Sequence, residues 1–240
     1  MSKTVAIYSI NFGGYRSEIK GGIDNKLQKY EKGIDYYFFT DNKNLKSKNW
    51  KIIYVNLKPR TSFLNTYRHT SKYYKFVIPR ILHNYDYIMF MDSNKVCYLN
   101  QICCKQYFFD FIKKNCNNKK DLILFNHPVR YTPQEELDTT LRLKSEHFQE
   151  DLFEDEKNGK KFLELIKNMK FNLRLPDTGV IIHTNPKKSV PVFREIYNLM
   201  LTFGLRRDQN VINYILKKEK YESKVLMCRY WGIPGEFLKK

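Results

Sequence analysis

Short runs of apolar residues recur along the chain, and several are separated by segments long enough to form helices. The runs are Val5–Tyr8, Tyr36–Phe39, Ile52–Val55, Ile88–Met91, Leu122–Phe125 and Val180–Ile182. The run at Ile88–Met91 does not alternate apolar with polar residues, which is typical of a strand covered on both faces. Strands that alternate with helical segments favour a largely parallel sheet between helices. The sequence therefore predicts the α/β class.

Length and composition favour one globular domain. The chain has 240 residues, enough for one large domain and somewhat short for two, since domains usually hold about 100–200 residues. Hydrophobic residues make up 42%, with 17 Phe and 18 Tyr, which argues against disorder. We expect a single domain over residues 1–240. Within it, the polar stretch 131–161 has the character of a helical or loop insertion, a kind that often covers a site.

The charge of the chain implies polyanionic partners. Lys and Arg number 43 and Asp and Glu 25, a net charge of +18, which suits nucleic acid, phosphate-bearing small molecules or an anionic membrane surface. The basic residues are spread along the chain, and no zinc-finger spacing, RNP-like motif or basic zipper is present. We therefore expect no nucleic-acid partner.

The chain lacks the sequence signals of export. No stretch approaches the roughly 20 apolar residues of a membrane span, and the first residues lack a signal-peptide layout. The five cysteines are odd in number and lack paired C-x-x-C spacing, which favours reduced thiols. We expect a soluble, cytoplasmic protein without a transmembrane segment.

The segment YDYIMFMDSNK, residues 85–95, ends a buried strand on Asp92, Ser93 and Asn94. Ligands of α/β sheets bind beyond the carboxyl ends of the strands. The oxygens of Asp92 and Asn94 suit a metal ion or the hydroxyl groups of a sugar. Asp-Ser-Asn is also ordinary turn chemistry, and this alternative stays open.

Two further strands end on polar residues. The first is followed by NFGGYR, residues 11–16, in which Gly13 and Gly14 allow close approach of the backbone to a ligand and Arg16 suits a phosphate. The second ends in FFTD, where Asp41 suits a base or ribose. A plain Gly-Gly turn and a capping role for Asp41 are the alternatives. The G-x-G-x-x-G fingerprint and a Walker loop are both missing.

The segment 65–82 predicts a helix, with apolar residues at i, i+4, i+7 and i+8 from Tyr74. Arg68, Lys72 and Lys75 fall on one face of it. Because this helix precedes the strand that carries Asp92, its cations are candidates for contact with a diphosphate. A solvated basic face is the alternative.

Three later segments carry candidate site residues. FNHPVRYTPQEE, residues 126–136, places His127 and Arg130 after a strand. RLPDTGVIIHT, residues 174–184, places Asp177 before a buried strand. GLRRDQNVINYIL, residues 204–216, has Asp208 where a helix N-cap is expected, which by itself explains that residue.

In this order and at these intervals, the motifs from about residue 4 to about residue 218 resemble a family of nucleotide-sugar glycosyltransferases. This family, formerly of unknown function, includes plant rhamnogalacturonan galacturonosyltransferase-like proteins and glycosyltransferases of large DNA viruses. The resemblance implies a GT-A fold, a Rossmann-like α/β/α sandwich with a mostly parallel mixed central sheet. It also implies Mn²⁺ or Mg²⁺ at a D-x-D position, here Asp92 and Asn94.

We assign two roles to the candidate residues. Asp92, Asp177 and Asp208 would be catalytic, with Asp177 and Asp208 the acids to test for acceptor-side chemistry. The residues that would bind the nucleotide-sugar are Asn11, Gly13, Gly14, Tyr15, Arg16, Asp41, Arg68, Lys72, Lys75, Ser93, Asn94, His127, Arg130, Arg207 and Gln209.

The chain departs from the family pattern at the metal site. Asn94 replaces the second acid of the D-x-D position, which removes a negative charge and weakens metal binding. Many GT-A enzymes also take a histidine ligand near the C-terminus, and the tail MCRYWGIPGEFLKK has none. We expect Arg68, Lys72, Lys75 and Arg130 to carry more of the diphosphate neutralisation.

These observations predict a hexosyl- or deoxyhexosyl-transferase that moves a sugar from a nucleotide diphosphate, a UDP-sugar, to a glycan or other hydroxyl acceptor. Two alternatives stay open. A nucleotidyltransferase acting on sugar phosphates would use the same acidic strand end for two-metal chemistry. A basic nucleic-acid-binding protein would use the charge.

Overall fold

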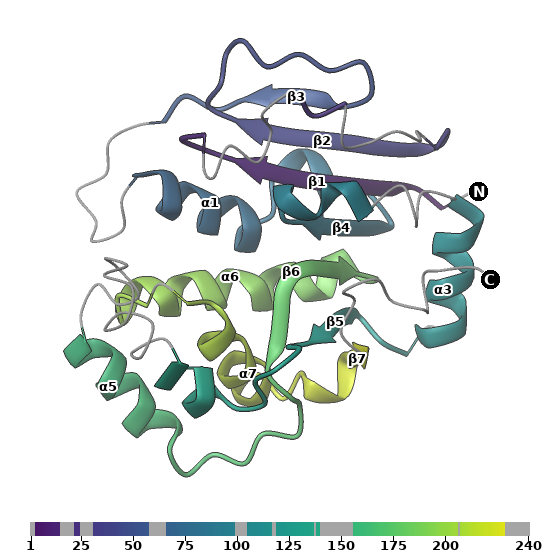
Figure 1. The fold of residues 1–240 in the computed structure, drawn as a ribbon. Helices are drawn as coiled ribbons and strands as arrows, with labels where there is room; N and C mark the ends of the chain where they lie inside the picture. Colours follow the sequence, from purple (N-terminus) through teal and green to yellow (C-terminus); the bar gives the residue numbers. More distant parts are fainter. Residues whose placement is uncertain are drawn as a thin grey trace.

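A seven-stranded sheet runs through the molecule (Figure 1). The computed structural model describes residues 3–14, 22–24, 31–57, 66–98, 105–116, 119–136, 138–139, 156–205 and 207–228. The strands are β1 (Val5–Asn11), β2 (Ile34–Thr40), β3 (Lys51–Tyr54), β4 (Tyr87–Met91), β5 (Leu122–Asn126), β6 (Pro176–His183) and β7 (Val225–Cys228). The predicted apolar runs fall on strands, except that Val55 lies one residue past the end of β3.

The sheet has the order β3-β2-β1-β4-β6-β5-β7. All neighbouring pairs are parallel except those that involve β6, which runs antiparallel to β4 and to β5. Figure 1 shows β3, β2 and β1 in the upper part of the molecule and β5, β6 and β7 in the lower part. This mostly parallel mixed sheet confirms the predicted fold class.

The helices cover both faces of the sheet. They are α1 (Thr66–Phe76), α3 (Lys105–Cys116), α5 (Glu156–Ile166), α6 (Pro186–Thr202) and α7 (Gln209–Lys218), with 3₁₀ turns η2 (Arg80–Leu82), η3 (Ser93–Tyr98) and η4 (Glu222–Lys224). Helices α1, α5, α6 and α7 pack on one face and α3 on the other. Among the residues that the structure describes, no helix is long and apolar enough to cross a membrane.

Strand β4 shows why the central strands are apolar throughout. Ile88 and Phe90 point into the core beneath α1 and α6, whereas Met89 and Met91 point into the core beneath α3. Because successive side chains of a strand face opposite sides, a strand between two helical layers needs apolar residues at every position. This is the pattern on which the α/β prediction rests.

The predicted helix over 65–82 is shorter than expected. It ends at Phe76, and Arg80–Leu82 forms a separate 3₁₀ turn. Pro79 explains the break, since proline lacks an N–H group and disfavours helical geometry at the residue before it. The apolar residues that extended the predicted helix, such as Leu82, instead pack under the turn.

Phe90 provides a test of this core. Its side chain is fully buried in β4 and its ring is tilted against that of Tyr8, with ring centroids 5.2 Å apart. We expect Phe90→Ala to lower the free energy of unfolding by about 3–5 kcal/mol, because the substitution leaves a cavity. Urea denaturation measures the loss. Val129→Ala, at a residue 71% exposed, is the control and should change stability by less than about 0.5 kcal/mol.

Candidate functional site

The antiparallel strand β6 brings its first residues to the edge where parallel strands end. Met91, the last residue of β4, pairs with Val180, and the N–H group of Asp92 donates to the carbonyl of Gly179 at 2.9 Å. At the other side of β6, Asn126 at the end of β5 pairs with Pro176. Asp177 and Thr178 therefore lie between the ends of β4 and β5.

Asp208 forms two ion pairs and a hydrogen bond at this edge of the sheet. Its Oδ2 atom lies 2.8 Å from Nζ of Lys75 and 2.9 Å from Nζ of Lys72, and the hydroxyl of Thr178 donates to it at 3.1 Å. Lys75 also donates to Thr178 at 3.0 Å. Burial alone would raise the pKa of Asp208, but the charges of the two lysines outweigh it and hold this pKa below its usual value. Asp208 is therefore ionised at neutral pH.

This arrangement replaces two simpler explanations drawn from the sequence. Asp208 stands at the N-cap position of α7, yet its side chain makes no capping hydrogen bond. Lys72 and Lys75 do not form a solvated basic face, since their side chains are 18% and 6% exposed. Arg68 lies one turn earlier on α1 and is partly buried. The predicted stripe thus points toward the sheet edge, where its lysines bind a buried acid.

Asp92 is the acid of this group that solvent reaches. Its side chain is 41% exposed, and its Oδ1 atom lies 4.0 Å from Nζ of Lys75. Burial raises the pKa of Asp92, although the charges of Lys75, Lys95 and Lys72 oppose the rise. Because 41% of the side chain meets water and three lysines oppose the rise, we expect Asp92 to be ionised at neutral pH.

Asp177 is paired with a lysine that the sequence did not single out. Nζ of Lys95 lies 3.0 Å from Oδ2 of Asp177. The same lysine is held close to Asp92, because its N–H group donates to the carbonyl of Asp92 at 2.8 Å in the turn η3. The other carboxylate oxygen of Asp177 accepts the N–H of Gly179 at 2.9 Å. Lys95 therefore links the end of β4 to the start of β6.

A second charged group lies after β5. Arg130 contacts both His127 and Glu136, and Arg207 lies 3.8 Å from Glu136. Glu136 is fully buried, and burial raises its pKa against the opposing charges of the two arginines. Burial, followed by the charge of Arg130, lowers the pKa of His127 to about 4. His127 is therefore neutral at pH 7, and the net charge here comes from the arginines.

The turn after β1 packs against α1 and the end of β2. The N–H group of Gly13 donates to both carboxylate oxygens of Asp41, at 3.0 and 3.1 Å. Gly13 has φ +68°, and a Cβ at this position would lie 2.6 Å from Cγ of Tyr67. Only glycine fits both the backbone angle and the ring. Asn11 is buried beside this turn, and its amide donates to the hydroxyl of Ser93 at 3.3 Å.

The remaining predicted residues are placed as follows. Gly14, with φ +61°, completes the glycine turn, and Gln209 begins α7 beside Asp208. Asn94 is exposed in η3. Tyr15, Arg16 and residues 140–155 of the predicted insertion lie outside the described residues.

The donor set at this edge fits a divalent cation poorly. A hard cation such as Mg²⁺ takes about six oxygen ligands, which usually include one or two unpaired carboxylates besides waters and substrate phosphates. Asp177 and Asp208 are already paired with lysines, and Asp92 has a lysine 4.0 Å away. Within the described part of the chain, no group of three or more His, Cys, Asp or Glu side chains is arranged to hold a metal. Mn²⁺ or Mg²⁺ at Asp92 and Asn94 stays a prediction.

Sequence reasoning missed Thr178, Lys95 and Glu136. Thr178 and Lys95 each lie within three residues of a predicted acid, in PDTG and DSNK. This proximity to predicted site acids was the signal in the sequence that could have identified Thr178 and Lys95 as site residues. Glu136 lies in a polar run, PQEE, where nothing in the sequence distinguishes the buried glutamate from its exposed neighbour Glu135. Only the folded chain separates these two residues.

Comparisons with known proteins show a shared fold. No protein-family model matches the sequence, and no curated protein sequence matches it. The chain is similar to the apo structure of the WbbM bifunctional glycosyltransferase, with TM-score 0.52 and 14% identity over 95% of this chain and 39% of that chain. It thus spans well under half of WbbM. The glycosyltransferase GlyE of Streptococcus pneumoniae TIGR4 has TM-score 0.46 and 9% identity over 95% and 45%, too weak a likeness for argument. The likeness to WbbM supports a GT-A, Rossmann-like fold, while the family with plant and viral members stays a prediction.

Asp208→Asn tests the buried ion pairs. The substitution keeps the size of the side chain but leaves Lys72 and Lys75 without their closest counterion. We expect the free energy of unfolding to fall by about 3–5 kcal/mol, the usual loss when one partner of a buried pair is removed. Glu164→Gln breaks the exposed pair with Lys167 and is the control, with an expected loss below about 1 kcal/mol. Equal losses in urea denaturation would contradict the buried pairing.

The pH dependence of this loss follows from the lowered pKa of Asp208. An aspartate of the unfolded chain titrates near about pH 3.9. Since folding favours the ionised form, the stabilisation is complete well above that pH and is lost as the pH falls toward the folded pKa. The difference in unfolding free energy between wild type and Asp208→Asn should be constant from about pH 7 to 5 and should shrink below about pH 3.9. A difference that grows with acidity would show that the carboxylate is not stabilised in the folded state.

Proposed function

We propose that this chain is a glycosyltransferase that moves a sugar from a UDP-sugar to a hydroxyl group of a glycan. The observation that carries the proposal is the set of lysines fixed at the carboxyl end of β4, in a sheet with the GT-A arrangement. Nζ of Lys75 lies 4.0 Å from Oδ1 of the exposed acid Asp92. The backbone N–H of Lys95 donates to the carbonyl of Asp92, and its Nζ is paired with Asp177. Ligands of such sheets bind at this edge.

The proposed reaction needs charge stabilisation on the leaving group. The acceptor oxygen attacks the anomeric carbon, the bond from that carbon to the diphosphate oxygen breaks, and its electron pair stays on the diphosphate. The proton of the acceptor hydroxyl passes to a carboxylate. Ammonium and guanidinium groups fixed beforehand stabilise the departing diphosphate without reorganisation during the reaction. Lys75, Lys95 and Arg130 are the cations that this proposal assigns to that charge.

The acids of the site differ in how well they suit proton transfer. Asp208 is 3% exposed and its pKa is lowered by Lys72 and Lys75, so we assign it the role of holding these lysines. Asp92 and Asp177, with side chains 41% and 13% exposed, can reach a substrate. A carboxylate that a substrate can reach is better placed to accept a proton than a buried one paired with two lysines. We assign contact with the donor to Asp92 and keep Asp177 as the acceptor-side candidate.

The nucleoside would lie over the ends of β1 and β2. There the glycine turn at Gly13 and Gly14 exposes backbone, since both residues are open to solvent. Asp41 holds that turn through the N–H group of Gly13, and Tyr67, which is 48% exposed, offers an aromatic face beside it. A hydrogen-bonding turn next to an exposed ring suits a base and a ribose.

Nucleotide selectivity tests the proposal. We expect UDP or a UDP-sugar to raise the melting temperature more than ATP, GTP or NAD does, in thermal-shift measurements with and without Mn²⁺. A ligand that binds only the folded state adds about 2.7 kcal/mol of stability at 100 times its dissociation constant. Equal shifts for all nucleotides, or none, would reject the UDP-sugar donor. Release of pyrophosphate from a nucleoside triphosphate and a sugar phosphate would instead identify a nucleotidyltransferase.

Asp92→Asn tests the role of the exposed acid. Asparagine keeps a good turn residue, and the backbone hydrogen bonds of Asp92 remain available, so we expect an unchanged melting temperature. Donor turnover, followed as release of UDP, should fall by about 100-fold or more. Glu195→Gln removes an exposed acid from α6 and should leave turnover unchanged. Wild-type turnover in the Asp92→Asn protein would show that Asp92 has no role in the reaction and that the strand end is a simple turn.

A further inference from the structure

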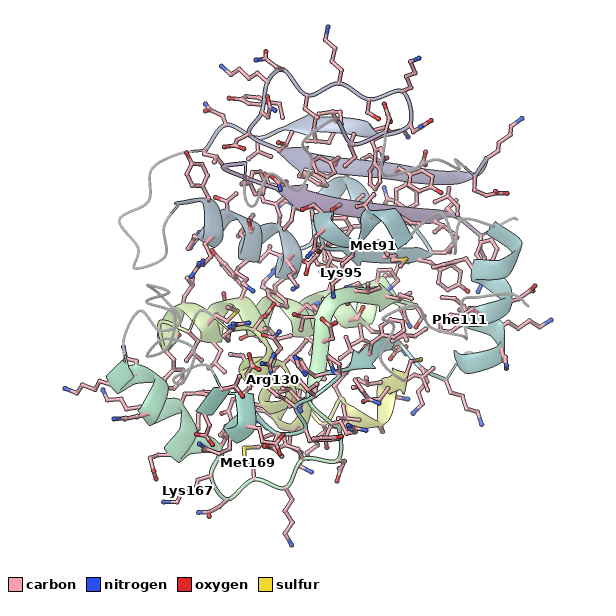
Figure 2. All side chains as sticks on the ribbon, in the orientation of Figure 1. Met91, Lys95, Phe111, Arg130, Lys167 and Met169 are labelled. Carbon is pink, nitrogen blue, oxygen red and sulfur yellow. The ribbon has the colours of Figure 1, made fainter. Side chains whose placement is uncertain are left out.

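Lys95 occupies a central position between two strand ends. Figure 2 shows it in the middle of the molecule, near Met91 and above Arg130. Its side chain is 17% exposed and its Nζ lies 3.0 Å from Asp177, while its charge also acts on Asp92. The ammonium group thus lies within electrostatic reach of two carboxylates that come from different strands. In a metal-dependent site of this kind, a divalent cation would take a place among such carboxylates.

The path of the Lys95 side chain depends on Gly179. A Cβ at residue 179 would overlap the end of the lysine, lying 2.6 Å from its Cε and 2.9 Å from its Cδ. Gly179 lies inside β6, where its backbone pairs with the residue after β4. Because Gly179 has no side chain, the side chain of Lys95 can pass over the backbone at this position and reach Asp177. Gly179 therefore leaves room for the ammonium group, and Asp177 holds it there.

The neighbouring charges favour a cation supplied by the chain over a bound metal ion. Each acid near this point has a lysine partner: Asp177 has Lys95, and Asp208 has Lys72 and Lys75. A divalent ion at Asp92 would be repelled by these ammonium groups, and besides the diphosphate it would have one carboxylate of the chain to hold it. Asn94, which replaces the second acid, adds no negative charge. A diphosphate carries the opposite sign and would be attracted by the same groups.

We propose that the ammonium group of Lys95, positioned by Gly179 and Asp177, takes the place of the divalent metal ion and binds the diphosphate of the donor. It follows that this protein binds a nucleoside diphosphate without a divalent cation. This inference rests on the proposed function and makes it more specific. It assigns to Lys95, a residue that the family pattern does not include, the charge that a metal would supply.

Calorimetric titration of the wild-type protein with UDP tests the metal independence. We expect the dissociation constant in EDTA to agree within about twofold with that in Mn²⁺, because no metal takes part in binding. UDP binding that falls tenfold or more in EDTA and returns with Mn²⁺ would overturn the inference and leave the proposed function standing. An absence of UDP binding under both conditions would overturn both.

Two variants test the role of Lys95 itself. Lys95→Met removes the charge, and Gly179→Ala keeps the charge but forces the lysine away from its place. Lys95→Met should weaken UDP binding in EDTA by about tenfold or more, the usual size for a hydrogen bond to a charged group, and Gly179→Ala, which displaces only the flexible end of the lysine, should weaken it by a smaller factor. Uridine binding should change little in either variant, because uridine carries no phosphate. Lys113→Met, at an exposed lysine of α3, should bind both ligands as the wild type does.

The comparison of UDP with uridine separates binding from a structural role. If the Lys95–Asp177 pair serves only to join β4 and β6, the variants will lose stability while UDP and uridine binding change together. That result would overturn the inference. Since Lys95→Met leaves Asp177 without its lysine, the double variant Lys95→Met/Asp177→Asn removes both charges and provides a folded protein for the same titration. UDP binding by this double variant at wild-type strength would equally overturn the inference.

Discussion

The carboxylate of Asp208 is the interaction on which the site depends. It lies at the start of α7 and meets Lys72 and Lys75 from α1 together with Thr178 from β6. An unpaired charge at such a buried position would be strongly unfavourable. Helix α1 therefore turns its lysines inward, toward the start of α7 and the start of β6. The same placement sets Lys75 beside Asp92, so one buried acid positions a cation next to the exposed one.

The direction of β6 gives this edge its chemistry. If β6 ran parallel to its neighbours, its last residue, His183, would lie at this edge of the sheet. His183 is buried and hydrogen-bonded to Ser189. Because β6 is antiparallel, its opening residues Asp177 and Thr178 arrive instead. Gly179 follows at the point where Lys95 crosses the strand. The antiparallel direction of β6 thus places at the site both Asp177 and the glycine that makes room for Lys95.

The basic character of the chain is locally balanced at the site. Lys72, Lys75 and Lys95 are each held by an aspartate, and Glu136 holds two arginines. Held in this way, the cations keep fixed positions before a ligand arrives. Fixed donors need no reorganisation when negative charge develops, which is the main source of electrostatic catalysis. The acids of this site therefore act chiefly on the lysines, and Asp92 is the acid most open to a ligand.

The sequence by itself determined the layers of the fold. Uninterrupted apolar runs such as Ile88–Met91 require helices on both faces, and Asp92 follows such a run directly, so its place at a strand end was readable. Only the tertiary structure decided which charges meet. The sequence predicted Lys72 and Lys75 as a phosphate-facing stripe and Asp208 as a cap, but their pairing joins residues more than 130 positions apart. The position of Lys95 close to Asp92 in the sequence did not reveal its role, since its partner Asp177 and the glycine that makes room for it lie on β6. Burial and charge pairing between distant segments are properties of the packed chain, and local residue patterns do not encode them.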